Sequence, residues 1–158
     1  MKQSLVACCL PLMLFAGQAA ADCTTSPIVV NAKLTTLFSG KLVCGSPGAN
    51  YPGGAGSPDR WQEEHLGTGG GELWDYKLGP TDVVDPRKRV GSWSIAGDKL
   101  VHTYTGGETY SWDVRMVSPT QVSFCIGAAE HAKGNVITSS SGCGGVLPAG
   151  VAGAAAKK

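Results

Sequence analysis

Hydrophobic and polar residues alternate most clearly between Thr109 and Val117. Every second position carries a large apolar side chain, and the positions between them are polar or charged. A period of two places one set on a buried face of a β-strand and the other in solvent. The apolar set is Tyr110, Trp112, Val114 and Met116.

Other short segments have a strand-like pattern and are separated by turns rich in Gly, Pro and Asp. In residues 72–78 the pattern predicts that Trp74, Tyr76 and Leu78 share one face and that Asp75 and Lys77 share the other. Such segments at regular spacing are typical of an antiparallel meander. We expect an all-β, mainly antiparallel domain of about six or seven strands that curls into a small barrel or half-barrel. The candidate strands are 41–44, 60–65, 72–78, 89–96, 99–105, 109–117 and 121–126, with 135–139 as an additional short candidate.

One short helix is predicted ahead of these strands, over Ala32–Ser39. Asn31 is a suitable N-cap, and Gly40 can end the helix in the left-handed conformation. Three apolar residues repeat at helical spacing and give the helix a buried face, namely Leu34, Leu37 and Phe38.

The first 21 residues have the pattern of a secretory signal peptide. Lys2 precedes an apolar run from Leu5 to Ala16, and Ala19 and Ala21 fit the small-residue cleavage pattern. The run is too short to span a bilayer, which needs about 20 residues. We therefore expect cleavage after Ala21 and a secreted or periplasmic protein of the bacterial envelope. Residues 22–145 form the single β domain, and 146–158 form a flexible Gly- and Ala-rich tail.

Four cysteines remain after this cleavage: Cys23, Cys44, Cys125 and Cys143. An even number of cysteines behind a signal peptide indicates disulfides. Four cysteines allow three pairings, and the cost of closing a loop favours the shorter ones. We therefore expect Cys23–Cys44 and Cys125–Cys143.

Charge excludes nucleic acid as an expected partner. The chain has 13 Lys and Arg against 12 Asp and Glu, a net charge of +1, and so lacks the basic excess that binds phosphate backbones. The only basic run, residues 87–89, is interpreted as a solvated loop. No segment after residue 21 is apolar and long enough to cross a membrane.

The aromatic residues are the strongest candidates for a ligand site. Rings on neighbouring strands can line one cavity, although a domain of this size also needs them for its core. The core interpretation is the simpler one for each single residue. The predicted ligand-binding residues are Trp61, Trp74, Trp93, His102 and Tyr104.

Catalytic and metal-binding motifs are absent from the sequence. On a strand, Glu63 and His65 share a face with Trp61, and this carboxylate–imidazole pair, or Asp75, is the one candidate for hydrolytic chemistry. The three histidines are far apart in the chain and no cysteines have C-x-x-C spacing, so the sequence predicts no metal site. We expect no catalytic residue and no cofactor.

Residues 90–114 read VGSWSIAGDKLVHTYTGGETYSWDV. The pattern G-x-W-x-[IV]-x-G-D-x-[LV], followed by an aromatic-rich strand, resembles small secreted bacterial lipocalin-like proteins. The resemblance covers about a third of the chain after residue 21. It implies an eight-stranded barrel that holds an apolar ligand, and it assigns no individual binding residue.

These observations favour a non-enzymatic, secreted or periplasmic binding module for a small apolar or aromatic ligand, or for an envelope component. The alternative is an interaction or inhibitor module whose partner is a secreted protein. That module would act through its loops, for which residues 45–58 and 79–88 are the candidates. A hydrolase that uses Glu63, His65 or Asp75 is the third hypothesis.

Overall fold

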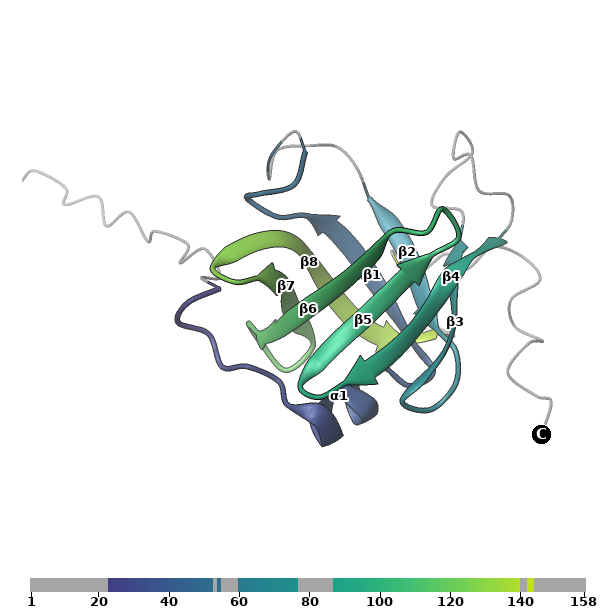
Figure 1. Cartoon of the computed structure of the whole chain (residues 1–158), viewed down its shortest axis with the longest axis horizontal. Helices are drawn as coiled ribbons and strands as arrows, with labels where there is room; N and C mark the ends of the chain where they lie inside the picture. The colour runs from purple at the N-terminus through teal and green to yellow at the C-terminus, as the bar shows by residue number, and fades with distance from the viewer. Residues whose placement is uncertain (1–22, 53, 55–59, 77–86, 140–141, 144–158) are drawn as a thin grey trace, which may run out of the picture.

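Eight antiparallel strands form a closed barrel in the computed structural model (Figure 1). The structure describes residues 23–52, 54, 60–76, 87–139 and 142–143. The predicted signal peptide and the tail 146–158 lie outside these residues. The elements are α1 (Asn31–Phe38), β1 (Lys41–Pro47), β2 (Trp61–His65), β3 (Gly70–Tyr76), β4 (Arg87–Ala96), β5 (Lys99–Tyr104), β6 (Thr109–Met116), β7 (Gln121–Ile126) and β8 (Ala129–Thr138).

The predicted fold class is confirmed, with eight strands where six or seven were expected. Each strand pairs with the next, and β8 pairs with β1. The barrel is therefore closed rather than a half-barrel, and no strand is left with an unpaired edge. Strand β8 is longer than its sequence pattern indicates, because residues 129–134 pair with β7 and residues 132–134 pair with β1 as well.

The predicted loops are shorter than expected at their ends. Residues 45–47 belong to β1, and residues 87 and 88 belong to β4. The central parts of both loops, residues 53, 55–59 and 79–86, lie outside the described residues.

Helix α1 closes one end of the barrel, where it lies below the strands in Figure 1. Leu34 and Phe38 are fully buried, as their spacing predicts. The cap differs from the prediction: Val30 is the N-cap residue, and the backbone N–H of Asn31 donates to the Asp98 carboxylate in the β4–β5 turn. Gly40 has a φ of 64°, so the left-handed end of the helix is confirmed.

The alternation in β6 is confirmed by the burial of Trp112 and Val114. In residues 72–76, Trp74 and Tyr76 share one face as predicted, because both pack in one cluster with Leu42. That face is the outer one, and Leu73 joins the core inside the barrel. Residues 77 and 78 lie outside the described part of the chain.

The outer face of β1, β2 and β3 is also covered. Buried Gln62 accepts a hydrogen bond from the backbone N–H of Cys143 at 2.9 Å, and the Tyr76 hydroxyl donates to Glu64. Cys143 therefore holds the end of the described chain against the outside of the barrel.

The predicted disulfide pairing is wrong. The bonds join Cys23 to Cys125 and Cys44 to Cys143, across 102 and 99 positions. Short loops are favoured only in a chain whose ends are free to move. Here the segment before α1 runs along β6, where Ile28 bridges to Arg115, and this contact brings Cys23 to β7.

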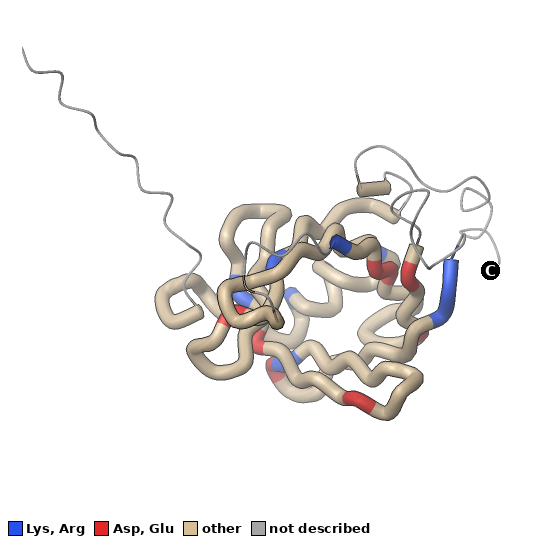
Figure 2. Tube along the Cα trace, turned by 90° about the horizontal axis from the view of Figure 1, so that it is seen from above, with Lys and Arg blue, Asp and Glu red and all other residues tan. Residues whose placement is uncertain are grey.

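Charged residues of both signs are spread around the barrel (Figure 2). The basic residues 87–89 begin β4, and the Arg87 guanidinium lies 4.9 Å from the centre of the Trp74 ring. Among the described residues, no helix is long and apolar enough to span a membrane. The two disulfides are typical of proteins from extracellular or other oxidising compartments.

Candidate functional site

A pocket of about 820 Å³ lies at the end of the barrel opposite α1. We call it the mouth pocket. Strands β2, β6 and β8 begin at this end and β5 ends there, so side chains distant in sequence meet around it. Its lining residues are Tyr51, Pro52, Arg60, Trp61, Glu63, Asp75, Tyr104, Glu108, Tyr110, Trp112, His131 and Ala132.

Aromatic rings make up two walls of the mouth pocket. Tyr51 and Trp61 are stacked with their centroids 6.0 Å apart. Tyr110 and Trp112 are stacked at 5.2 Å with their planes only 9° apart. Flat, rigid rings in this arrangement are suited to contact another flat apolar group.

A pair of carboxyl groups lies deeper in the same pocket. Glu63 on β2 and Asp75 on β3 are cross-strand partners, and both line the pocket. They point inward because they alternate with Gln62 and Trp74, which belong to the outer face. Glu63 is buried, and the Tyr104 hydroxyl donates a hydrogen bond to its Oε1 at 3.0 Å.

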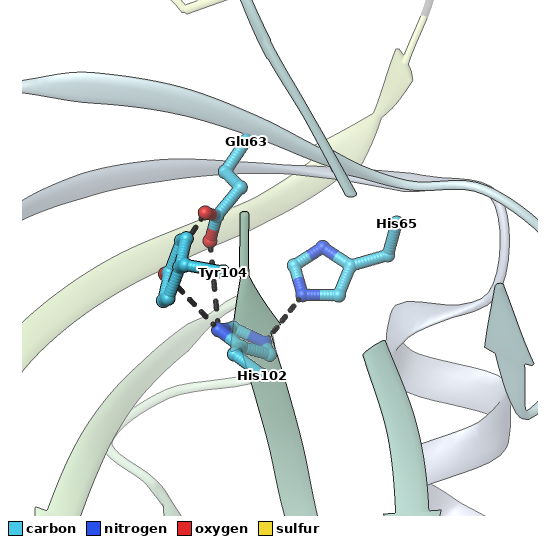
Figure 3. Close-up of polar contacts among 4 residues, drawn as sticks. All are labelled: Glu63, His65, His102 and Tyr104. Carbon is cyan, nitrogen blue, oxygen red and sulfur yellow. Dashed lines mark hydrogen bonds and ion pairs between the residues drawn. The ribbon is translucent and has the colours of Figure 1, made fainter. Parts of the chain in front are cut away.

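Two histidines lie next to Glu63 inside the barrel. Figure 3 shows His65 and His102 with their rings facing each other, and the two Nε2 atoms are 3.0 Å apart. The other ring nitrogen of His102, Nδ1, lies 3.7 Å from Glu63 Oε2 and 3.4 Å from the Tyr104 hydroxyl. Both histidines are almost completely buried, at 0% and 3% exposure.

Burial raises the pKa of the carboxyl group and lowers the pKa of both imidazoles, so it favours the neutral form of each group. Loss of water, and then the charge of Asp75, raise the pKa of Glu63 from 4.5 to about 8. Burial lowers the pKa of His102 to about 3, and burial with the neighbouring His102 lowers the pKa of His65 well below 6.5. At neutral pH the interior therefore holds two neutral imidazoles and a Glu63 side chain that is mostly protonated.

Glu63, His65 and His102 are also the types of residue that bind metal ions. One ligand atom from each lies within 4.8 Å of the others. Neutral imidazole nitrogens and a carboxylate are typical ligands of zinc and related ions. The sequence pattern placed Glu63 and His65 on one strand face but predicted no metal site. His102 lies 37 positions from His65, and only closure of the barrel brings β5 opposite β2.

The structure brings three of the five predicted ligand-binding residues together. Trp61 and Tyr104 line the mouth pocket, and His102 lies beside Tyr104. Trp93 lies in the core, where its indole N–H donates to the Leu66 carbonyl at 2.7 Å. Trp74 packs on the outer cluster with Leu42 and Tyr76.

Several lining residues were absent from the predicted site. Tyr110 and Trp112 were assigned to the buried face of their strand, and they line the pocket together with His131 of β8. The alternation in β6 predicted the inward direction of Tyr110 and Trp112 correctly. It gave no indication of depth, which distinguishes a residue at the barrel mouth from one in the core.

A second hollow of about 870 Å³ lies between α1 and the ends of β6 and β8. Among the described residues that line it are Val29, Leu37, Met116 and Ile137, with lysines and threonines but no aromatic ring and no carboxylate. It has neither the stacked aromatic rings nor the inward-facing carboxyl groups of the mouth pocket. The mouth pocket is therefore the stronger candidate site.

No family model, curated protein or solved structure matches this chain. The function is therefore inferred from the side chains at the site.

Proposed function

We propose that this protein is a secreted or periplasmic binding module that holds a small aromatic ligand in the mouth pocket. The observation that carries the proposal is the pair of stacked aromatic walls, Tyr51 with Trp61 and Tyr110 with Trp112, on one concave site. A volume of about 820 Å³ is within the roughly 300–1,000 Å³ typical of small-molecule sites.

Polar groups indicate what the ligand carries besides its ring. The Trp112 indole N–H is buried and has no hydrogen-bond partner among the described residues, so a ligand acceptor could pair with it only if the ring shifts on binding. Asp75 lines the deeper part of the pocket, where an ammonium or hydroxyl group can donate to it. We therefore favour a planar aromatic compound with at least one hydrogen-bonding substituent.

The proposed location rests on residues 1–21 and the two disulfides. Removal of the signal peptide after Ala21 leaves a chain whose described cysteines are all paired. Disulfides persist in the periplasm and outside the cell. A soluble carrier or sensor in that compartment fits a site of this size.

Native mass spectrometry of protein purified gently from a periplasmic extract tests the proposal. We expect an added mass that disappears on denaturation and identifies the ligand. Trp61→Ala should lose this mass, whereas Trp74→Ala, which removes a similar ring from the outer face, should keep it. A bare protein that also shows no tryptophan fluorescence change with any aromatic compound would contradict the proposal.

A hydrolase is the second candidate, because Glu63 and Asp75 meet in the pocket. A carboxyl group whose pKa is raised to about 8 suits a general acid, and a neighbouring carboxylate suits a base or nucleophile. Turnover of glycoside or ester substrates that Glu63→Gln and Asp75→Asn both abolish would favour this candidate over a binding module.

A further inference from the structure

We propose that Glu63, His65 and His102 form a binding site for a divalent transition-metal ion of the zinc type. The three side chains come from β2 and β5, which are not neighbours in the sheet and face each other across the barrel interior (Figure 3). This site does not depend on the aromatic ligand, and it would place a metal ion at the floor of the mouth pocket.

The spacing of the two imidazoles is close to that of a metal-bound pair. Their Nε2 atoms are 3.0 Å apart. Two nitrogens bound to one tetrahedral zinc at the usual 2.0–2.1 Å lie about 3.3 Å from each other. The rings therefore need to separate by only about 0.3 Å for an ion to replace the hydrogen bond between them.

Glu63 provides the third ligand from the same strand as His65. Its carboxylate is held by a long side chain with three rotatable bonds, and its contact with His102 Nδ1 is long, at 3.7 Å. Its remaining polar contact within Figure 3 is the hydrogen bond from Tyr104. Glu63 can therefore turn toward the two Nε2 atoms without breaking a tight ion pair.

Charge balance also favours a divalent ion. Two carboxyl groups, Glu63 and Asp75, are cross-strand partners in this interior. A doubly charged cation with both carboxylates ionised makes the buried group neutral overall, and a neutral assembly avoids the large cost of an unbalanced charge away from water. The two histidines enter the site as neutral ligands.

The arrangement leaves a coordination position free on the side of the mouth pocket. Glu63 and Tyr104 both line that pocket, so an ion can enter through it. Three protein ligands with an open fourth position are typical of zinc sites that bind water or a substrate, whereas structural zinc sites are closed. A donor atom on a bound ligand, or the Tyr104 hydroxyl, can occupy the fourth position.

Zinc and cobalt titrations of the full secreted chain, with its disulfides intact and after chelator treatment, test this inference. We expect one zinc ion per chain by calorimetry, and the visible absorption of four-coordinate Co²⁺ when cobalt replaces zinc. His102→Ala should weaken zinc binding by more than the roughly 10–100-fold that loss of an outer-shell partner costs. Glu72→Gln removes a half-exposed carboxylate of β3 that does not line the mouth pocket, and this variant should bind zinc as the wild type does.

A measurement on the wild type keeps the inference testable if the variants fail to fold. In ¹⁵N-histidine NMR spectra, one equivalent of zinc should shift the ring nitrogens of His65 and His102 and leave those of His131 unchanged. Zinc binding that shifts only His131, or that survives in His102→Ala, would overturn the site. The absence of any one-to-one binding would overturn it as well. None of these results depends on whether an aromatic ligand binds.

Discussion

Replacement of Glu63 by glutamine tests how the barrel interior controls charge. The change keeps the length of the side chain and a hydrogen-bond acceptor for Tyr104, but it removes the ionisable group. Glu63 is 5% exposed and faces Asp75 from β3, and His102 and Tyr104 from β5. We expect this variant to change how stability depends on pH in the metal-free protein.

The sign follows from the pKa of Glu63, which folding raises from 4.5 to about 8. Between these values the folded protein holds a proton that the unfolded chain has released, so stability falls as pH rises. The slope is about 1.4 kcal/mol per pH unit, which gives about 5 kcal/mol across the whole window. His65 and His102 act oppositely, because their lowered pKa values cost stability only below pH 6.5.

Among these groups, only Glu63 differs in protonation between the folded and the unfolded state from pH 6.5 to 8. In that window wild type should lose about 2 kcal/mol of unfolding free energy relative to Glu63→Gln. Urea unfolding at several pH values, with a chelator present, measures the difference. Glu72→Gln removes a half-exposed carboxylate of β3. Its unfolding free energy should change with pH as that of the wild type does. Parallel curves for wild type and Glu63→Gln would refute the reasoning.

Three further changes test the pocket walls, the core and the disulfides. In Gly45→Ala the new Cβ would lie 2.0 Å from the Trp61 ring, so the ring must move. We expect the free energy of unfolding, measured with urea, to fall by about 1–3 kcal/mol and ligand binding to weaken. Trp112→Ala removes an indole that is 8% exposed and should cost about 3–5 kcal/mol in the same assay. Replacement of both Cys23 and Cys125 by serine should lower the free energy of unfolding by about 4 kcal/mol, because the disulfide closes a loop of roughly 100 residues.

Controls distinguish these effects from general damage. Gly106→Ala places a Cβ where no atom lies within 4 Å, and it should match wild type in stability and binding. Wild-type stability in Trp112→Ala would contradict the burial of that ring. Peptide mapping without reduction should recover Cys23 linked to Cys125, and a peptide linking Cys23 to Cys44 would contradict the described pairing.

The local pattern of apolar residues correctly predicted the buried face of those elements that are covered on one side only. The alternation in β6 predicted Trp112 and Val114 as inward residues, and the stripe of Leu34 and Phe38 predicted the buried face of α1. Glu63 and His65 were placed on one face for the same reason. In each case a fixed period, 2.0 or 3.6 residues, converts sequence position directly into direction.

Pattern failed where burial occurs on both faces of a strand. The pattern grouped Trp74 with Tyr76 without deciding which face they occupy, and both lie on the outer face, near Cys143. Asp75, on the other face, lines the mouth pocket with Glu63. A period of two separates the two faces of β3, but it cannot say which is the interior when the chain covers both.

The sequence by itself determined the class of fold, the short helix and which residues of a strand share a face, because these depend on neighbours a few positions apart. The tertiary structure alone decided the strand count, the disulfide partners and the meeting of Glu63, His65 and His102. Those features join residues between 37 and 102 positions apart. Their distance depends on how the barrel closes, because the pairing of β1 with β8 closes the sheet and places β2 opposite β5 across the interior.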